Sequence, residues 1–288
     1  MLQHQGAVAS SPGSARFVLA LLVGLSGASQ DFAEAQESEE RSNASADSNS
    51  AWRPLFNGRD IDDWMVKLNH RDVGDNYGDT FRVVDGILQV RYDKYDGFNE
   101  QFGHLYYKEP FSHYHLVVEY RFVGDLYPTA PDYARLNSGV MLHSQDPRKM
   151  LRDQNWPISI ELQFLAGLGD GRPRATGNVC TPGTHIVYDG RLTRAHIVQS
   201  SAETYPPEQW VRAEAIVRGN ESITHLIDGK EVLQYSQPQI GGGIVAGYDP
   251  EEFVEGKLLS EGFIALQAEG QPVDFRKVEI RVLPQEDD

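Results

Sequence analysis

The chain of 288 residues has one cysteine, Cys180, and is poor in basic residues. A single cysteine cannot form an internal disulfide, which excludes a small disulfide-stabilised scaffold. The 26 Lys and Arg residues are outnumbered by 42 Asp and Glu residues, for a formal net charge of −16. Because phosphate backbones favour basic surfaces, this balance argues against a nucleic-acid partner.

Long apolar runs are also missing. The longest, residues 17–28, is shorter than the ~20 residues that a membrane-spanning helix needs. Arg16 precedes it and small residues follow, a pattern that predicts a signal peptide over residues 1–35, cleaved after Ala35 or, as second choice, after Ser29. An N-terminal core helix is the alternative. We expect a bacterial protein exported to the periplasm or secreted, with no stable membrane anchor.

Residues 36–51 contain mainly Ser, Asn, Ala and acidic residues, without aromatic or β-branched side chains. Such a segment cannot bury enough apolar area to offset the entropy of ordering, so we predict a disordered linker. The folded domain is then expected over residues 52–288. That length is common for one all-β sandwich, while the oligomeric state is left open.

Alternation of apolar and polar residues recurs over 115–122, 158–164 and 211–217, which predicts half-buried strands. Asp-Gly pairs at 85–86, 189–190 and 228–229 are flanked by similar runs and predict tight hairpins. No segment has a sustained helical period. The predicted fold is therefore all-β, an antiparallel jelly-roll β-sandwich.

Strand parity predicts one polar face. Alternate residues from Asn137 to His143 share a face, and in the later strand Glu161 and Gln163 point away from the apolar positions. If these strands are neighbours, His143 and Glu161 lie on one surface. An ordinary solvated sheet face is the alternative.

The second Asp-Gly hairpin adds further candidates. Its two-residue turn places His185 opposite Arg194 and on the same face as His196. Together with His143 and Glu161, these groups suggest a metal or proton-transfer site, because histidine serves both purposes. Their spacing matches no known metal motif, so each histidine has a purely structural interpretation as well.

A conventional glycosidase needs two carboxylates, but Gln163 and Ala166 stand where laminarinase-type sandwich glucanases have further acids. The chain also lacks a Gly-x-Ser-x-Gly elbow and a phosphate-binding loop. Any chemistry is therefore expected to use fewer carboxylates.

Several segments resemble the 3-keto-disaccharide hydrolase family, formerly a domain of unknown function. They are WRPLFNGRDIDDW at 52–64, NSGV at 137–140, IELQ at 160–163, the hairpin at 224–232, and GFIALQ with VDFRKV between 262 and 278. The resemblance covers nearly all of residues 52–283. It implies a concanavalin A-like, laminarinase-like jelly roll and cleavage of glycosides whose glucose unit carries a 3-ketone.

The resemblance also implies a mechanism. A ketone at C3 acidifies the proton at C2, so one base can abstract it, and the enolate can expel the group at C1 before water adds. An electrophile such as a divalent metal ion, Arg or His would stabilise the enolate. By this resemblance Glu161 is the base or a metal ligand, and His143 and His185 are metal ligands or electrophiles.

The predicted substrate contacts are polar side chains and one aromatic ring: Asn137, Gln163, Tyr92, Arg194 and Gln267. The chain departs from the family pattern over residues 163–167 (QFLAG), which lack an Asp, and over 176–184, which replace a Gly-Ser-x-Tyr-Gly turn. Both departures are close to the predicted site.

Two other classes of function compete with an enzyme. A non-catalytic carbohydrate-binding domain fits the same fold, with 12 Phe, 13 Tyr and 4 Trp available for stacking on sugars. A structural surface module without a small ligand is the third possibility. Cys180 is expected to be buried or to line the pocket, and the acidic segment 249–255 is expected to be a solvated loop rather than a calcium site.

Overall fold

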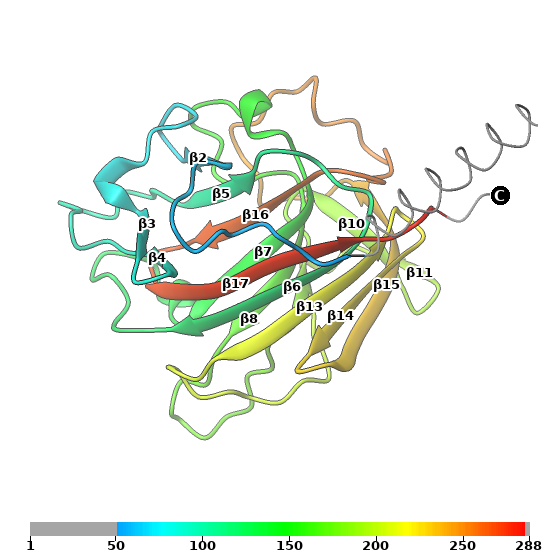
Figure 1. Cartoon of the computed structure of the whole chain (residues 1–288). Coiled ribbons are helices and arrows are strands. Elements are labelled where there is room, and N and C mark those ends of the chain that lie inside the picture. Colours follow the sequence, from blue (N-terminus) through cyan, green and yellow to red (C-terminus); the bar gives the residue numbers. More distant parts are fainter. Residues whose placement is uncertain (1–50, 286–288) are drawn as a thin grey trace, which may run out of the picture. The chain divides into compact units, whose positions relative to one another are not determined.

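The computed structural model describes residues 51–285, which form two antiparallel sheets packed face to face. The predicted all-β jelly-roll sandwich is confirmed. In Figure 1, β17, β6, β13, β14 and β15 run side by side in front of β7 and β8. The predicted signal peptide and residues 36–50 of the predicted linker lie outside the described residues. Within residues 51–285, no helix has the length and apolar character needed to cross a membrane.

The larger sheet has ten strands. In pairing order they are β11 (Arg191–Thr193), β10 (Thr184–Tyr188), β15 (Lys230–Ile240), β14 (Ser222–Ile227), β13 (Val211–Arg218), β6 (His113–Phe122), β17 (Val273–Val282), β4 (Ile87–Val90) and β3 (Phe81–Val84), with β1 (Arg53–Pro54) also paired to β17.

The smaller sheet has seven strands. In pairing order they are β12 (Ile197–Val198), β9 (Asn178–Cys180), β8 (Ile160–Leu165), β7 (Asn137–Ser144), β16 (Phe263–Ala268), β5 (Gly103–Tyr107) and β2 (Trp64–Leu68). Three short 3-10 helices interrupt the strands: η1 (Tyr77–Asp79), η2 (Asp132–Ala134) and η3 (Pro147–Lys149). The predicted neighbours β7 and β8 are indeed paired.

All three predicted hairpins are present. In the first, Asp85 and Gly86 have φ angles of 51° and 77°, and Val84 pairs with Ile87. The turns at 189–190 and 228–229 also combine two positive φ angles. Asp and Gly tolerate this left-handed conformation better than most residues, which is why the sequence signal was sufficient.

Apolar side chains from the two sheets form one core between them. Tyr120 of β6 stacks on Phe164 of β8, with ring centroids 4.1 Å apart and an interplanar angle of 11°. The Tyr120 hydroxyl forms a 2.7 Å hydrogen bond with Thr176 Oγ1. Because the ring pair joins strands of different sheets, it fixes how they face each other.

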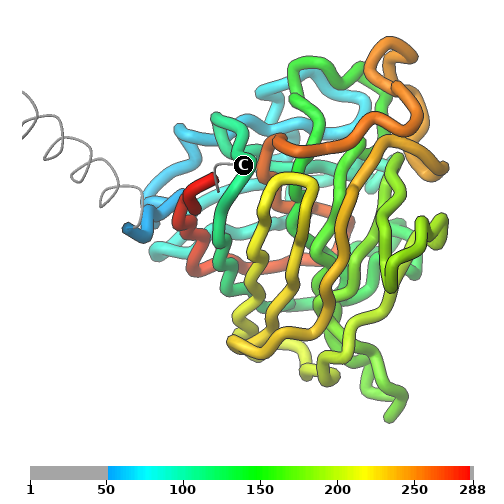
Figure 2. The backbone as a smooth tube through the Cα atoms, turned by 90° about the vertical axis from the view of Figure 1, so that its right-hand side faces the viewer, coloured from blue at the N-terminus to red at the C-terminus, as the bar shows by residue number. Residues whose placement is uncertain are grey.

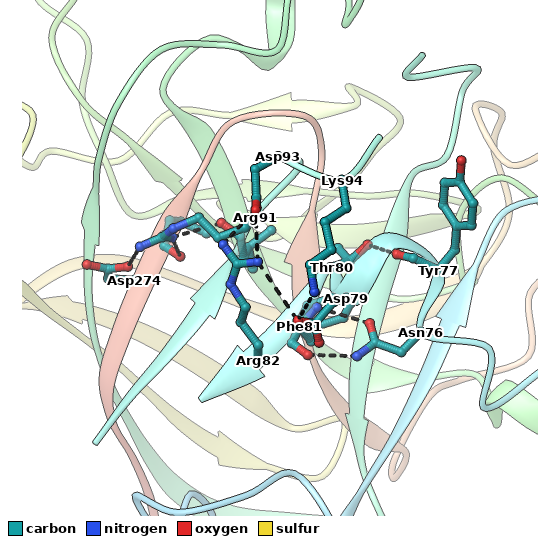
Figure 3. Close-up of polar contacts among 12 residues, drawn as sticks. Asn76, Tyr77, Asp79, Thr80, Phe81, Arg82, Arg91, Asp93, Lys94 and Asp274 are labelled. Carbon is teal, nitrogen blue, oxygen red and sulfur yellow. Dashed lines mark hydrogen bonds and ion pairs between the residues drawn. The ribbon is translucent and has the colours of Figure 1, made fainter. Parts of the chain in front are cut away.

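Charged residues tie together the larger sheet around β3 and β4 (Figure 3). Asp274 of β17 has a side chain only 3% exposed, and its carboxylate accepts hydrogen bonds from Arg91 at 2.5 Å and from Arg121 at 2.9 and 3.0 Å. Such a nearly buried carboxylate needs both partners to offset its lost hydration. These contacts link β17 to β6 and to the residue after β4.

The stacked pair provides a test of the sandwich packing. We expect Phe164→Ala to lower the free energy of unfolding by about 3–5 kcal/mol, because it leaves a cavity between the sheets. Urea denaturation would measure the change. As a control, Leu192→Ala on exposed β11 should change the free energy by no more than about 0.5 kcal/mol. Equal effects of the two substitutions would contradict the assigned core.

Candidate functional site

The outer face of the smaller sheet forms the floor of a cavity of about 620 Å³. Four strands or their ends supply the floor side chains: Asn137 and Met141 from β7, Glu161, Gln163 and Leu165 from β8, Asn178 and Cys180 from β9, and Gln267 and Glu269 from β16 and the residue after it. Glu161 pairs with Met141 on one side and with Cys180 on the other. The polar side chains of these strands therefore face a cavity rather than bulk water.

Two loops explain why this face is buried. Segments 145–159 and 241–262 lie side by side at one end of the sandwich (Figure 2). Asn155 joins them, since its Oδ1 accepts a 2.8 Å hydrogen bond from Ala246 N and its Nδ2 donates one of 3.2 Å to the Ile244 carbonyl. Trp156 and Ile244 from these loops line the cavity. The alternative of a solvated sheet face is wrong.

The amide side chains on the floor hold one another in place. Gln163 Nε2 donates to Asn137 Oδ1 at 3.1 Å, and Asn178 Nδ2 donates to Gln163 Oε1 at 3.1 Å. The backbone N–H of Ser200 in turn donates to Asn178 Oδ1 at 2.9 Å. These bonds orient the predicted substrate contacts Asn137 and Gln163, and both line the same cavity as Glu161.

Glu161 is a buried carboxyl on the floor whose lost hydration is not fully replaced by hydrogen bonds. It is 6% exposed, and its buried Oε1 has no hydrogen-bond partner within the described part of the chain. Burial disfavours the charged form and raises the pKa of Glu161 to about 8. The carboxylate lies so close above Gly139 that a Cβ at that position would overlap it. Only glycine leaves this space free.

A second carboxylate, Glu269, was missed from the sequence. It is 5% exposed, lines the same cavity, and its Oε2 also has no hydrogen-bond partner among residues 51–285. Burial and then the neighbouring Glu161 raise its pKa well above the usual value, against a smaller effect of Arg174. The cavity therefore contains two carboxyl groups, where the sequence had pointed to Glu161 alone. Strand alternation places Glu269, two residues after Gln267, on the same face, so this pattern could have identified it.

His143 does not join Glu161, which corrects the parity prediction. The alternation is correct as far as Leu142, but β7 then bulges: His143 has a φ of 47°, and the pairing with β16 shifts between Phe263 and Ala265. His143 Nε2–H donates to the Gly219 carbonyl at 2.8 Å, and the residue lines a different pocket of about 320 Å³. Burial lowers its pKa to about 4.

His185 is also placed elsewhere. Its predicted hairpin register is correct, since Tyr188 pairs with Arg191. The ring of His185, however, packs against Gly241 and Gly242 and does not line the cavity that contains Glu161.

The chain beyond that hairpin separates the remaining candidates. β11 ends at Thr193, so Arg194 does not pair with His185; it is exposed and does not line the cavity. The chain then crosses to the smaller sheet, where Ile197 pairs with Cys180. His196 consequently does line the cavity, on a side that the hairpin alone did not predict. Burial lowers the pKa of His196, which favours the neutral ring.

Tyr92 belongs to the core and is not a stacking platform. Its hydroxyl accepts a 2.7 Å hydrogen bond from Gly270 N, and its ring packs edge-on against Tyr95. The aromatic residues that line the cavity are Trp156 and Tyr133, which the sequence did not single out. Gln267 does line the cavity, with a buried Oε1 that has no hydrogen-bond partner in the described chain.

The expected metal-ligand set is not assembled. Among residues 51–285, no three His, Cys, Asp or Glu side chains are arranged to hold a metal ion. His143 and His185 lie away from Glu161, so this combination does not fit a divalent ion. We derive no chemical step through a metal.

The raised pKa of Glu161 makes a prediction about stability. A carboxylate whose pKa rises on folding favours the folded state below pH 4.5, and this contribution is lost as the pH rises from about 4.5 to about 8. Glu161→Gln removes the titration. We therefore expect the variant and the wild type to unfold similarly near pH 4.5, and the variant to be more stable by a few kcal/mol near pH 8.

Urea denaturation at several pH values would measure this difference. Glu231→Gln, at an exposed position of β15, is the matched control and should follow the wild type at every pH. A constant difference between Glu161→Gln and the wild type across this range would show that Glu161 titrates normally.

Comparisons with known proteins agree with this fold. A candidate glycosyl hydrolase from Parabacteroides distasonis is 16% identical, with a TM-score of 0.50 over 81% of this chain and 94% of its own. A second from the same organism is 18% identical, with a TM-score of 0.49 over 81% of this chain and 100% of its own. At 16% identity, the first of these structures supports the sandwich fold alone. A search of curated proteins found no significant sequence match.

A family model settles the relationship at the sequence level. The model described as a 3-keto-alpha-glucoside-1,2-lyase-like domain matches residues 51–281, nearly all of the folded chain. The resemblance found in the sequence motifs is thereby confirmed, and it assigns the chain to carbohydrate processing at the level of the family. The protein belongs to the 3-keto-alpha-glucoside-1,2-lyase-like domain family.

Proposed function

We propose that this protein cleaves glycosides whose glucose unit carries a ketone at C3, by elimination followed by addition of water. The observation that carries the proposal is the buried carboxyl of Glu161 on the floor of a sugar-sized cavity. Its Oε1 has no hydrogen-bond partner within residues 51–285, and its pKa is raised to about 8. We also propose export to the periplasm or beyond, in keeping with the apolar run at 17–28.

The chemistry starts at C2 of the oxidised sugar. Ionised Glu161 takes the proton at C2, which the adjacent ketone makes acidic, and the electron pair forms an enolate. The enolate collapses to a C1–C2 double bond as the bond from C1 to the leaving oxygen breaks, and that oxygen takes up a proton. Water then adds across the double bond, so that the net reaction is hydrolysis. A carboxylate with a pKa near neutrality is a better base than an ordinary one and is still ionised in part.

The remaining cavity groups suit the other requirements of this reaction. Burial and then Glu161 raise the pKa of Glu269 well above its usual value, which favours the protonated form. A protonated Glu269 can donate a hydrogen bond to the enolate oxygen without adding negative charge. Asn137 and Gln163, fixed by their mutual hydrogen bond, present amides for the sugar hydroxyls. One base and one neutral acid are thus present in a single cavity.

A second candidate is conventional hydrolysis of unoxidised glycosides. The presence of two carboxyl groups, Glu161 and Glu269, in one cavity is the observation that favours it. In that reaction one group acts as acid and the other as nucleophile or base.

The decisive assay incubates the wild type with a 3-keto-disaccharide, with and without a chelator, and follows the product. We expect turnover whose kcat/KM rises with pH up to about 8, because Glu161 must lose its proton to act. Glu161→Gln should lower kcat by about 10²–10⁴-fold, and Glu231→Gln should not change it. Full turnover by Glu161→Gln would exclude this base. If neither metal-loaded nor chelated wild type forms product, while glycan binding survives Glu161→Gln, a carbohydrate-binding domain is the better account.

Glu269→Gln separates the two candidate reactions. A Gln side chain can still donate a hydrogen bond to an enolate, so elimination from the 3-keto substrate should retain activity within about tenfold of the wild type. Conventional hydrolysis needs an ionisable group and should be lost. Cleavage of unoxidised disaccharides by the wild type, abolished in Glu269→Gln, would establish the second candidate in place of the first.

A further inference from the structure

We propose that the mouth of the cavity is a subsite for a neutral, apolar aglycone, the group that leaves from C1. This inference rests on the proposed function and adds the substrate class. It follows from the way in which polar and apolar side chains are divided along the cavity and from the backbone conformation of Ile244.

The division is between floor and mouth. Glu161, Gln163 and Gln267 on the floor are at most 6% exposed. By contrast, the lining residues Tyr133, Ile197 and Ile244 are 58%, 44% and 48% exposed. Large apolar side chains gathered at one opening commonly mark a binding surface, whereas single ones do not. A glycoside with its sugar on the floor would place its aglycone among these side chains.

The backbone conformation of Ile244 is the strongest indication that its side chain serves ligand binding. Its φ is 78°, a left-handed conformation that β-branched residues adopt only under strain. It follows three glycines, Gly241 to Gly243, and glycine at this position would avoid the strain. The side chain is nevertheless half exposed, so burial in the core does not explain it. Strain of this kind is concentrated at functional sites.

The wall around Ile244 is held firmly. Asn155 bonds to the Ile244 carbonyl, and Gly183 N donates to the Gly243 carbonyl at 3.2 Å. Trp156 in the adjacent loop packs on Phe102, with ring centroids 4.5 Å apart. A preformed wall loses little conformational freedom on binding, which favours affinity for a rigid apolar group.

The charge of the protein and the hydrogen-bonding groups of the cavity further restrict which aglycones can bind. The chain carries a net charge of −16, and two carboxyl groups lie below the mouth, which disfavours an anionic aglycone. A second sugar would need several hydrogen-bond partners. Away from the strand floor, the strongly polar lining side chains are Arg174, His196 and Gln199, and Tyr133 and Trp156 add one hydroxyl and one N–H. An aromatic or aliphatic alcohol fits the wall of Trp156 and Ile244 better.

The test uses Ile244→Asn, because Asn tolerates a positive φ and so should preserve or raise the melting temperature. With 4-nitrophenyl 3-keto-glucoside as substrate, we expect KM to rise roughly tenfold as the apolar contact is lost. With a 3-keto-disaccharide, KM should stay within about twofold. Leu192→Asn, on exposed β11 away from the cavity, should change neither.

A binding measurement keeps this inference separate from the proposed function. In the Glu161→Gln background, calorimetric titration would compare 4-nitrophenyl glucoside with an unoxidised disaccharide, with and without Ile244→Asn. A selective loss of nitrophenyl affinity supports the subsite even if the wild type turns over no 3-keto substrate, in which case only the proposed function fails. Equal losses for both ligands, no loss, or no binding of the nitrophenyl compound would overturn the subsite.

Discussion

The candidate site depends on the burial of the Glu161 carboxyl, whose Oε1 has no hydrogen-bond partner among residues 51–285. Such a group is costly to bury, since its charged form loses hydration and gains no compensating bond. The surrounding structure must therefore hold it in place: Gly139 leaves room beneath it, and paired β7 and β9 fix the strand that carries it. Burial thus raises the pKa of a carboxyl that would be an ordinary surface acid elsewhere to about 8.

The two-sheet architecture makes this possible. The core between the sheets, with Tyr120 stacked on Phe164, supports the smaller sheet from one side. That leaves its other face free to be covered by loops instead of by a third layer. Segments 145–159 and 241–262 provide part of the cover, through Trp156 and Ile244, and are joined through Asn155. Stability and site thus use opposite faces of the same strands.

Like charge connects the two carboxyl groups in the cavity. Glu269 is near enough to Glu161 for its pKa to rise further, so the pair is expected to hold at least one proton around neutral pH. One ionised and one protonated carboxyl group are complementary in function, since the first accepts a proton while the second donates a hydrogen bond. This combination suits the proposed elimination next to a ketone.

Local rules were enough to predict much of the fold and part of the site. Period two predicted strands β6, β8 and β13, the Asp-Gly pairs predicted three hairpins, and parity correctly turned Asn137, Glu161 and Gln163 to one face. These features depend on residues that are close together in the sequence and on local backbone sterics, so the sequence is sufficient to predict them. The tertiary structure alone decided the rest. A bulge turned His143 away, and the crossing after Thr193 brought His196 in without Arg194. Pairing of β16 with β7 placed Glu269 in the same cavity as Glu161. Each of those outcomes depends on contacts between segments far apart in the chain, which the alternation of residues along a single strand cannot predict.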